Sequence, residues 1–252
     1  MAAAPTPPAS MTPGSEPAPL SEGARILNAF IAPTKTFTDL RRNSSWWAPW
    51  LLISVFSLLF VYAMERQVGF EQITKNAIAQ SPRAEQFEKL PPEQRAKQMR
   101  ISTTVTAYIS WATPAVILVA YLIIAGVLLG TFKFGTSANV SFKTSLAIVN
   151  YASLPGIIGG ILGTAALFAG VDPEGFNPKN PVATNPAYFM DPTQNKFLYS
   201  MASGLDVFVI WSIVLMGIGF ACNSKVKRWS AIFIVAGWYL LYKLAGGAIA
   251  SL

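Results

Sequence analysis

The stretch WWAPWLLISVFSLLFVYAM, residues 46–64, contains 19 consecutive residues without a charged side chain. At about 1.5 Å per residue, a helix of this length matches a hydrocarbon core of roughly 30 Å. Trp46, Trp47 and Trp50 stand at its start, and such amphipathic rings prefer the headgroup level of a bilayer. The stretch therefore predicts a membrane-spanning helix.

The composition of the whole chain agrees with this interpretation. Hydrophobic residues make up 52% of the 252 residues and charged residues only 12%, which departs from the balance of a soluble protein. The apolar residues gather in uncharged runs instead of following amphipathic periods. We therefore expect an all-α, polytopic integral membrane protein built as a bundle of five transmembrane helices.

Further uncharged runs supply the other four predicted spans. We place them near residues 112–130, 145–170, 206–224 and 229–250. The run 101–132 is longer than one crossing needs, so a helical extension should precede the second span. Residues 65–100 are polar and divided by prolines, which predicts a helical extramembrane connector made of short pieces.

The N-terminal part of the chain divides at residue 22. Residues 1–21 are rich in Ala and Pro and predict a disordered tail, whereas residues 22–252 form the predicted membrane domain. Its first apolar positions have helical spacing and indicate a short interfacial helix that ends at Pro33. These positions are Ile26, Leu27, Phe30 and Ile31.

The distribution of Lys and Arg predicts the N-terminus inside and the C-terminus outside. The short loops on the predicted inner side are basic and contain no acid, whereas the connector 65–100 mixes seven basic residues with five glutamates. The absence of a secretory or organelle signal favours a bacterial inner membrane. The candidate contacts to lipid headgroups are Arg41, Arg42, Lys225, Lys227 and Arg228.

Several classes of chemistry are disfavoured by what the chain lacks. It has no histidine and one cysteine, Cys222, so histidine-dependent catalysis and an internal disulfide are excluded. We expect no enzyme, no catalytic residue, no cofactor and no metal site. The net charge of +7 is assigned to topology and lipid phosphates instead of nucleic acid. The expected partners are the lipid bilayer and either a membrane protein or further copies of this chain.

Two ionisable residues fall at membrane depth. Counted from Lys225 in the turn between spans four and five, Asp206 is 19 residues away and Lys243 is 18 residues away. In an antiparallel helical hairpin they reach similar depth, which predicts an intramembrane polar pair or a shared water pocket. The alternatives are a helix cap for Asp206 and snorkelling for Lys243.

Glycines at intervals of four residues in spans two and three indicate close helix packing. They resemble a nucleotide loop only superficially, because they lie inside an uncharged helical run without a preceding strand or a downstream acid. The predicted packing glycines are Gly126, Gly130, Gly156, Gly159, Gly160 and Gly163. Pro155, just before the last four, predicts a kink in span three.

A group of motifs resembles the bacterial branch of the Yip family. They are Pro33-Thr34-Lys35-Thr36-Phe37, the tryptophan-marked first span, the charged connector, Pro155, and Leu205-Asp206-Val207-Phe208-Val209-Ile210-Trp211. The resemblance covers roughly residues 25–250. It implies a five-span helical domain with a cytoplasmic N-terminus and no catalytic residues. Eukaryotic members of the family are membrane partners of Rab-type GTPases.

Two functions are compatible with these observations. The first is a non-enzymatic scaffold that organises protein partners or lipids at the membrane. The second is a small-solute or ion transporter or channel, in which Pro114, Pro155, the glycines of span three and the pair Asp206 and Lys243 line a path. Few polar residues in the spans and an odd number of spans weigh against the second function, although a homo-oligomer could supply the missing surface.

Overall fold

The computed structural model describes residues 18–81, 84–136 and 139–250. Residues 1–17 of the predicted disordered tail lie outside these ranges. Within them the secondary structure is helical and contains no strand, which confirms the all-α prediction.

The first half of the chain forms an N-terminal hairpin, a long span and the connector. Its helices are α1 Glu22–Ile31, α2 Pro33–Asp39, α3 Trp47–Gln67, α4 Phe70–Ala79, α5 Ala84–Glu88 and α6 Pro92–Trp111. The second half contains α7 Thr113–Thr136, α8 Phe142–Ala152, α9 Gly156–Phe168, the short 3-10 helix η1 Pro186–Phe189, α10 Lys196–Ser203, α11 Val207–Asn223 and α12 Arg228–Ala250.

Four helical stretches of the described chain are long and apolar enough to cross a membrane. They are α3, α7, the broken stretch Phe142–Phe168 formed by α8 and α9, and α12. The pair α10 and α11 is bent by 57° and makes a fifth when counted as one span. The chain is therefore a polytopic helical membrane protein, and the predicted five spans agree with this upper count.

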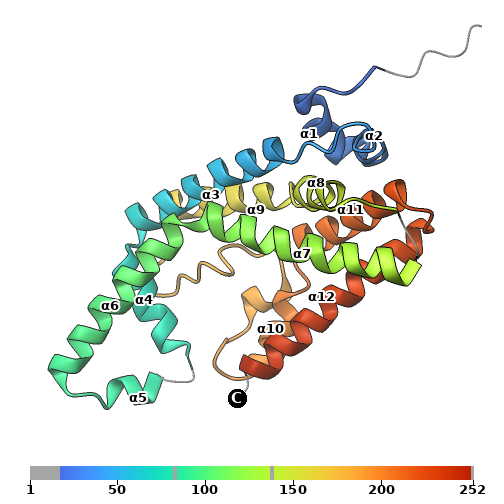
Figure 1. The fold of residues 1–252 in the computed structure, drawn as a ribbon. Helices are drawn as coiled ribbons and strands as arrows, with labels where there is room; N and C mark the ends of the chain where they lie inside the picture. Colours follow the sequence, from blue (N-terminus) through green and yellow to red (C-terminus); the bar gives the residue numbers. More distant parts are fainter. Residues whose placement is uncertain (1–17, 82–83, 137–138, 251–252) are drawn as a thin grey trace, which may run out of the picture.

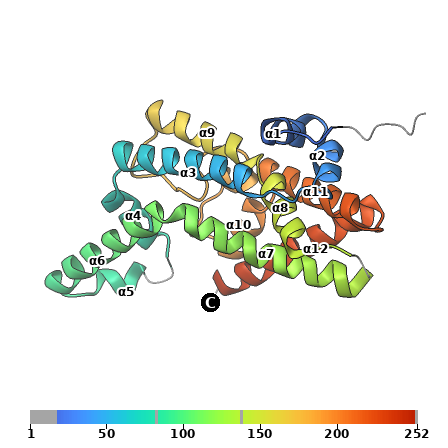
Figure 2. The same cartoon turned by 45° about the horizontal axis from the view of Figure 1, so that its top comes forward.

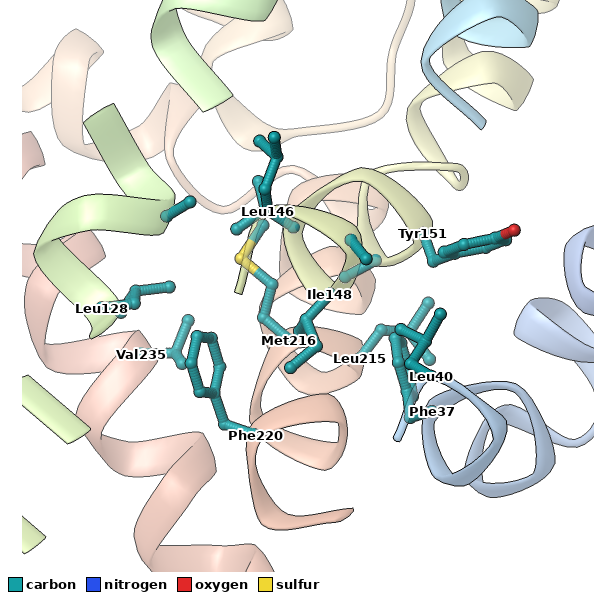
Figure 3. Packing of buried hydrophobic residues seen from close by; sticks show 14 of the residues in the cluster. Phe37, Leu40, Leu128, Leu146, Ile148, Tyr151, Leu215, Met216, Phe220 and Val235 are labelled. Carbon is teal, nitrogen blue, oxygen red and sulfur yellow. The ribbon is translucent and has the colours of Figure 1, made fainter. Parts of the chain in front are cut away.

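The spans pack side by side with the N-terminal hairpin against one end of them (Figure 1). Helix α3 packs along α9, α7 packs on α8, and α11 contacts α12, α8 and α2. Phe132 of α7 and Phe220 of α11 stack with ring centroids 4.3 Å apart, so α7 and α11 are in direct contact at these residues. Figure 3 shows the buried side chains that meet between α2, α7, α8, α11 and α12.

The connector forms a separate arm beyond the far end of α3. Helices α4, α5 and α6 lie outside the bundle in both views (Figures 1 and 2). Gly69 makes the turn from α3 into α4 with a φ of 82°, a conformation that a residue with a Cβ rarely adopts. The arm begins on a small apolar cluster that includes Val61, Phe70 and Leu167.

The predicted third span is broken in its middle. Helix α8 ends at Ala152 and α9 begins at Gly156, with Pro155 as the residue before it. Pro155 has no amide hydrogen and therefore cannot continue the ladder of α8. The amides of Leu154 and Gly156 instead bond to carbonyl groups three residues earlier. These two backbone amides therefore keep hydrogen-bond partners at the break.

Candidate functional site

A buried ion network lies between the N-terminal hairpin and the bundle. Arg25 of α1 is 1% exposed and Asp39 of α2 is 8% exposed. The Nε and Nη2 atoms of Arg25 each donate to Oδ2 of Asp39 at 2.7 Å. Its Nη1 atom donates to Oε1 of Glu22 at 3.2 Å. One guanidinium thus binds two carboxylates, which compensates charges that are removed from water.

The network continues into the bundle through Tyr151 of α8. The hydroxyl of Tyr151 donates to Oε2 of Glu22 at 2.5 Å, and the Tyr151 side chain is fully buried. The hydroxyl of Thr36 donates to the carbonyl oxygen of Arg25 at 2.7 Å, which joins α1 to α2. The hairpin therefore contacts α8 through the Glu22–Tyr151 hydrogen bond as well as through apolar packing.

Local sequence explains why these two short helices form. Ser21 caps α1, because its side-chain oxygen accepts a hydrogen bond from the amide of Ala24 at 3.2 Å. Pro33 opens α2 at a position where a helix needs no amide donor. Arg25 and Ala29 lie one turn apart and are both buried, so this face of α1 points into the protein.

Two opposing effects act on the pKa of Arg25. Burial lowers the pKa, whereas the hydrogen bond to Asp39 and the charge of that carboxylate raise it, and the net result is a pKa above the usual arginine value. A raised folded-state pKa stabilises the fold below the unfolded pKa, and this contribution is lost only as the pH rises through the folded pKa. Both pKa values lie far above neutrality, so Arg25 itself introduces no pH dependence there.

Helix α2 docks on the C-terminal end of α11. Phe37 and Leu40 have no exposed surface and lie beside α11 in Figure 3. The Nδ2 atom of Asn223 donates to the carbonyl oxygen of Phe37 at 2.8 Å. The Nε atom of Arg41 donates to the carbonyl oxygen of Cys222 at 2.6 Å, which satisfies a carbonyl at a helix end.

Eight exposed basic residues gather where α2, the α7–α8 connection and the α11–α12 turn meet. We call this surface the basic end, and its residues are Lys35, Arg41, Arg42, Lys133, Lys143, Lys225, Lys227 and Arg228. Two contacts join these parts of the chain: Nη2 of Arg228 donates to Oγ1 of Thr34 in α2 at 3.3 Å, and Oγ of Ser44, between α2 and α3, lies 2.8 Å from Oγ1 of Thr144 in the first turn of α8. The described acids nearby, Glu22 and Asp39, are both bound to Arg25. Among the described residues, basic side chains therefore outnumber acidic ones at the basic end.

The five residues predicted to contact lipid headgroups all belong to the basic end. Arg41 binds the carbonyl oxygen at the end of α11, and Nη2 of Arg228 donates to Oγ1 of Thr34 at 3.3 Å. Lys225 and Lys227 are exposed in the turn before α12. The structure thus brings the five together, while their contact with lipid stays a prediction.

Asp206 and Lys243 have different hydrogen-bond partners. Asp206 caps α11, because its Oδ1 atom accepts from two amides of the first turn at 2.9 and 3.1 Å. Its Oδ2 atom accepts from the hydroxyl of Thr184. The Nζ atom of Lys243 donates to Oγ of Ser203 at 3.0 Å. The ion pairs found among the described residues do not include these two, so their pairing stays a prediction.

The six predicted packing glycines differ in their surroundings. A Cβ atom on Gly163 would lie 2.9 Å from Cε2 of Phe60, and one on Gly159 would lie 3.1 Å from Cδ2 of Phe208. Among the described residues, a Cβ atom on the other four would meet nothing within 4 Å; these are Gly126, Gly130, Gly156 and Gly160. Of the six, Gly159 and Gly163 are thus the ones that lie close to a described side chain of another helix.

The closest helix approaches occur at glycines that the sequence did not single out. A Cβ atom on Gly217 of α11 would lie 2.5 Å from Cα of Ile232 in α12. One on Gly219 would lie 2.5 Å from Cγ2 of Ile148 and 3.1 Å from Cδ1 of Phe37. Gly217 and Gly219 are two residues apart, so they lack the four-residue spacing that indicates close helix packing.

Comparison with known proteins places the chain among membrane proteins. A family model for the Yip1 domain matches residues 27–249. The chain is also similar to Membrane protein YknW of Bacillus subtilis (strain 168), with 20% identity over 234 residues that cover 92% of this chain and 93% of that protein. No solved structure matches the chain.

Proposed function

The chain belongs to the Yip1 domain family, and we propose that it is a non-enzymatic scaffold that gathers anionic lipid and protein partners at its basic end. The basic end is the observation that supports this proposal. Eight exposed basic residues occupy one surface, and two carboxylates of the described residues nearby, Glu22 and Asp39, are bound to Arg25. Basic residues close to an anionic leaflet contribute about 1 kcal/mol each.

The proposed orientation follows from the same surface. With the N-terminus inside and the C-terminus outside, the basic end faces the anionic inner leaflet of a bacterial cytoplasmic membrane. The arm of α4, α5 and α6 then lies on the outer side. In that region exposed lysines alternate with glutamates, as in the pairs Lys75–Glu71 and Lys89–Glu85, so it offers little net attraction to anionic lipid.

The outward face of α1 supplies the surface proposed for a protein partner. Leu27 and Ile31 lie one turn apart and are 60% and 70% exposed. Phe30, by contrast, points inward and meets the ring of Trp211 with centroids 5.8 Å apart. Since the ion network holds α1 in a fixed position, this exposed pair is presented in one orientation beside the basic end.

We expect neutralisation of the α11–α12 turn to reduce the anionic lipid that copurifies with the protein. The variant combines Lys225→Gln and Lys227→Gln, both exposed residues. Losing two attractions of about 1 kcal/mol each corresponds to a roughly thirtyfold weaker preference at most, and about threefold is a conservative expectation. The measurement is the ratio of phosphatidylglycerol to phosphatidylethanolamine retained from nanodiscs of equal lipid content, read by mass spectrometry.

The matched control carries the same change of charge on the outer arm. It combines Lys75→Gln and Lys89→Gln, which are exposed residues of the arm, and the arm lies at the opposite end of α3 from α2 (Figure 1). The control should retain the wild-type lipid ratio. Equal lipid ratios in both double variants would contradict the proposal, because the preference would then depend on overall charge and not on the basic end.

A transporter is the second candidate, and the breaks in two spans are the observation that favours it. Broken helices often surround substrate sites in transporters, and here α8 meets α9 at Pro155 while α10 meets α11 at a bend of 57°. Tyr151 and Leu154 beside the first break are fully buried, which favours a packed junction instead of a water path. Tracer uptake into protein-containing vesicles above that of protein-free vesicles would favour the transporter.

A further inference from the structure

One face of α6 exposes large apolar side chains outside the bundle. Tyr108 is 74% exposed and Ile109 is 58% exposed, with Ile101 and Val105 at 55% and 48% on the preceding turns. The opposite side of α6 contacts α4, where Oγ1 of Thr74 donates to the hydroxyl of Thr106 at 3.2 Å. Helix α4 therefore covers one side of α6, whereas the apolar side of α6 stays exposed.

This apolar face continues along the outward face of α7. The spacing of three or four residues is kept across the junction at Ala112, and Val116, Val119, Ile123 and Val127 are exposed on α7. Only Ala112 separates the two helices, and the amide of Val116 bonds to the carbonyl of that residue. The exposed face of α7 belongs to a membrane span, so the α6 face is continuous with a lipid-facing surface.

The uncharged part of these two helices is too long for an upright crossing. Residues 101–132 carry no charge over 32 residues, which is about 48 Å of helix against a hydrocarbon core of roughly 30 Å. The bend at Ala112 turns α6 away from the axis of α7 (Figures 1 and 2). An oblique α6 can therefore keep its uncharged half close to the membrane.

The charged residues of α6 are confined to its N-terminal half. The charged residues Glu93, Arg95, Lys97 and Arg100 occupy its first half, and the second half has none. Lys97 stands one turn before Ile101 on the same face, so the face itself changes from charged to apolar. This gradient is typical of a helix that leaves a membrane obliquely.

The polar side chains in the uncharged half suit the interfacial layer. Most of them carry hydroxyl groups, such as Thr104, whose Oγ1 atom donates to the carbonyl oxygen of Arg100 at 2.9 Å. Trp111 and Tyr108 are amphipathic rings of the kind that collect at the headgroup level. Both kinds of side chain tolerate a layer with little water.

We propose that residues 101–111 of α6 lie in the lipid leaflet opposite the basic end and anchor the arm of α4, α5 and α6 to that surface. Lipid is the occupant that the continuity with α7 and the charge gradient support. A second copy of the chain covering the same face would instead place Tyr108 in a protein interface.

The single cysteine makes a direct test practical. In a Cys222→Ser background, nitroxide labels are attached at Tyr108→Cys, at Glu93→Cys and at Val119→Cys, and the protein is placed in nanodiscs of phosphatidylethanolamine and phosphatidylglycerol. All three positions are exposed, so the labels should not disturb packing, and thermal melting of each variant checks the fold. Collision rates with oxygen, which concentrates in lipid, and with a water-soluble nickel chelate report the surroundings.

We expect the label at position 108 to behave like the span label at 119. Its ratio of oxygen to nickel collisions should exceed that of the label at 93 by at least about threefold. Equal ratios at positions 108 and 93 would overturn the proposal, because α6 would then lie in water. Protection from nickel at position 108 that disappears when each nanodisc holds a single copy would overturn it in favour of a protein interface.

Discussion

Replacing Arg25 with alanine should cause the largest loss of stability of any single charge removal in the chain. The substitution leaves the carboxylate of Asp39, which is 8% exposed, without the two 2.7 Å hydrogen bonds that compensate its burial. Breaking a buried pair in this way costs about 3 to 5 kcal/mol. Thermal unfolding in detergent, followed by tryptophan fluorescence, should show a midpoint lowered by about 10 °C.

Two comparisons show whether the network is responsible. Lys35→Ala removes an exposed cation from the same hairpin and should change the stability by at most about 0.5 kcal/mol. Combining Arg25→Met, Asp39→Leu and Glu22→Gln removes all the network charges and should recover most of the loss, since an apolar replacement leaves no buried carboxylate unpaired. If Arg25→Ala melted like Lys35→Ala, the network would not hold the hairpin.

Gly217→Ala should be the most damaging of the glycine substitutions in the spans. The new Cβ atom would lie 2.5 Å from Cα and 2.8 Å from the backbone nitrogen of Ile232, and backbone atoms cannot move aside without separating α11 from α12. Overpacking of this kind costs about 1 to 3 kcal/mol and sometimes more. The same thermal unfolding assay should show a lower midpoint.

Gly130→Ala is the matched control and should act in the opposite direction. Nothing lies within 4 Å of a Cβ atom at this position, and alanine is the better helix former by up to about 1 kcal/mol. A midpoint that is unchanged or higher is expected. Equal losses for Gly217→Ala and Gly130→Ala would contradict the close contact between α11 and α12.

The spans could be predicted from the sequence because a bilayer imposes a length and excludes charge. The uncharged run that begins at Trp46 corresponds to α3, and the uncharged run that ends at Phe132 contains most of α7. The kink at Pro155 was expected because proline has no amide hydrogen. The position of α6 was partly foreseen as a helical extension before the second span. These features depend on local composition, which one sequence displays directly.

The ion network could not be predicted in the same way, because it depends on which faces meet. Nothing in the local sequence distinguishes Arg25 from the exposed cations near it, yet Arg25 is buried against Asp39 in the neighbouring helix. Tyr151, which binds Glu22, is 129 positions away from it in the sequence. Neither spacing nor hydropathy encodes a contact at that distance in the chain.

Equal depth of two residues likewise does not decide their partners. The count from Lys225 brought Asp206 and Lys243 to one level, and the structure places the side chain of Lys243 against Gly204, two residues before Asp206. Each is nevertheless bound to a hydroxyl, Asp206 to Thr184 and Lys243 to Ser203. Side-chain direction around each helix, which the count ignores, determines these contacts.

The orientation of the basic end is the central claim and can be measured in living cells. In the Cys222→Ser background, Lys227→Cys reports the basic end and Glu93→Cys reports the arm; both residues are exposed. A maleimide that does not cross the inner membrane should label position 93 in cells whose outer barrier is open, and should label position 227 only after the inner membrane is lysed. Labelling of position 227 without lysis, with protection of position 93, would contradict the account.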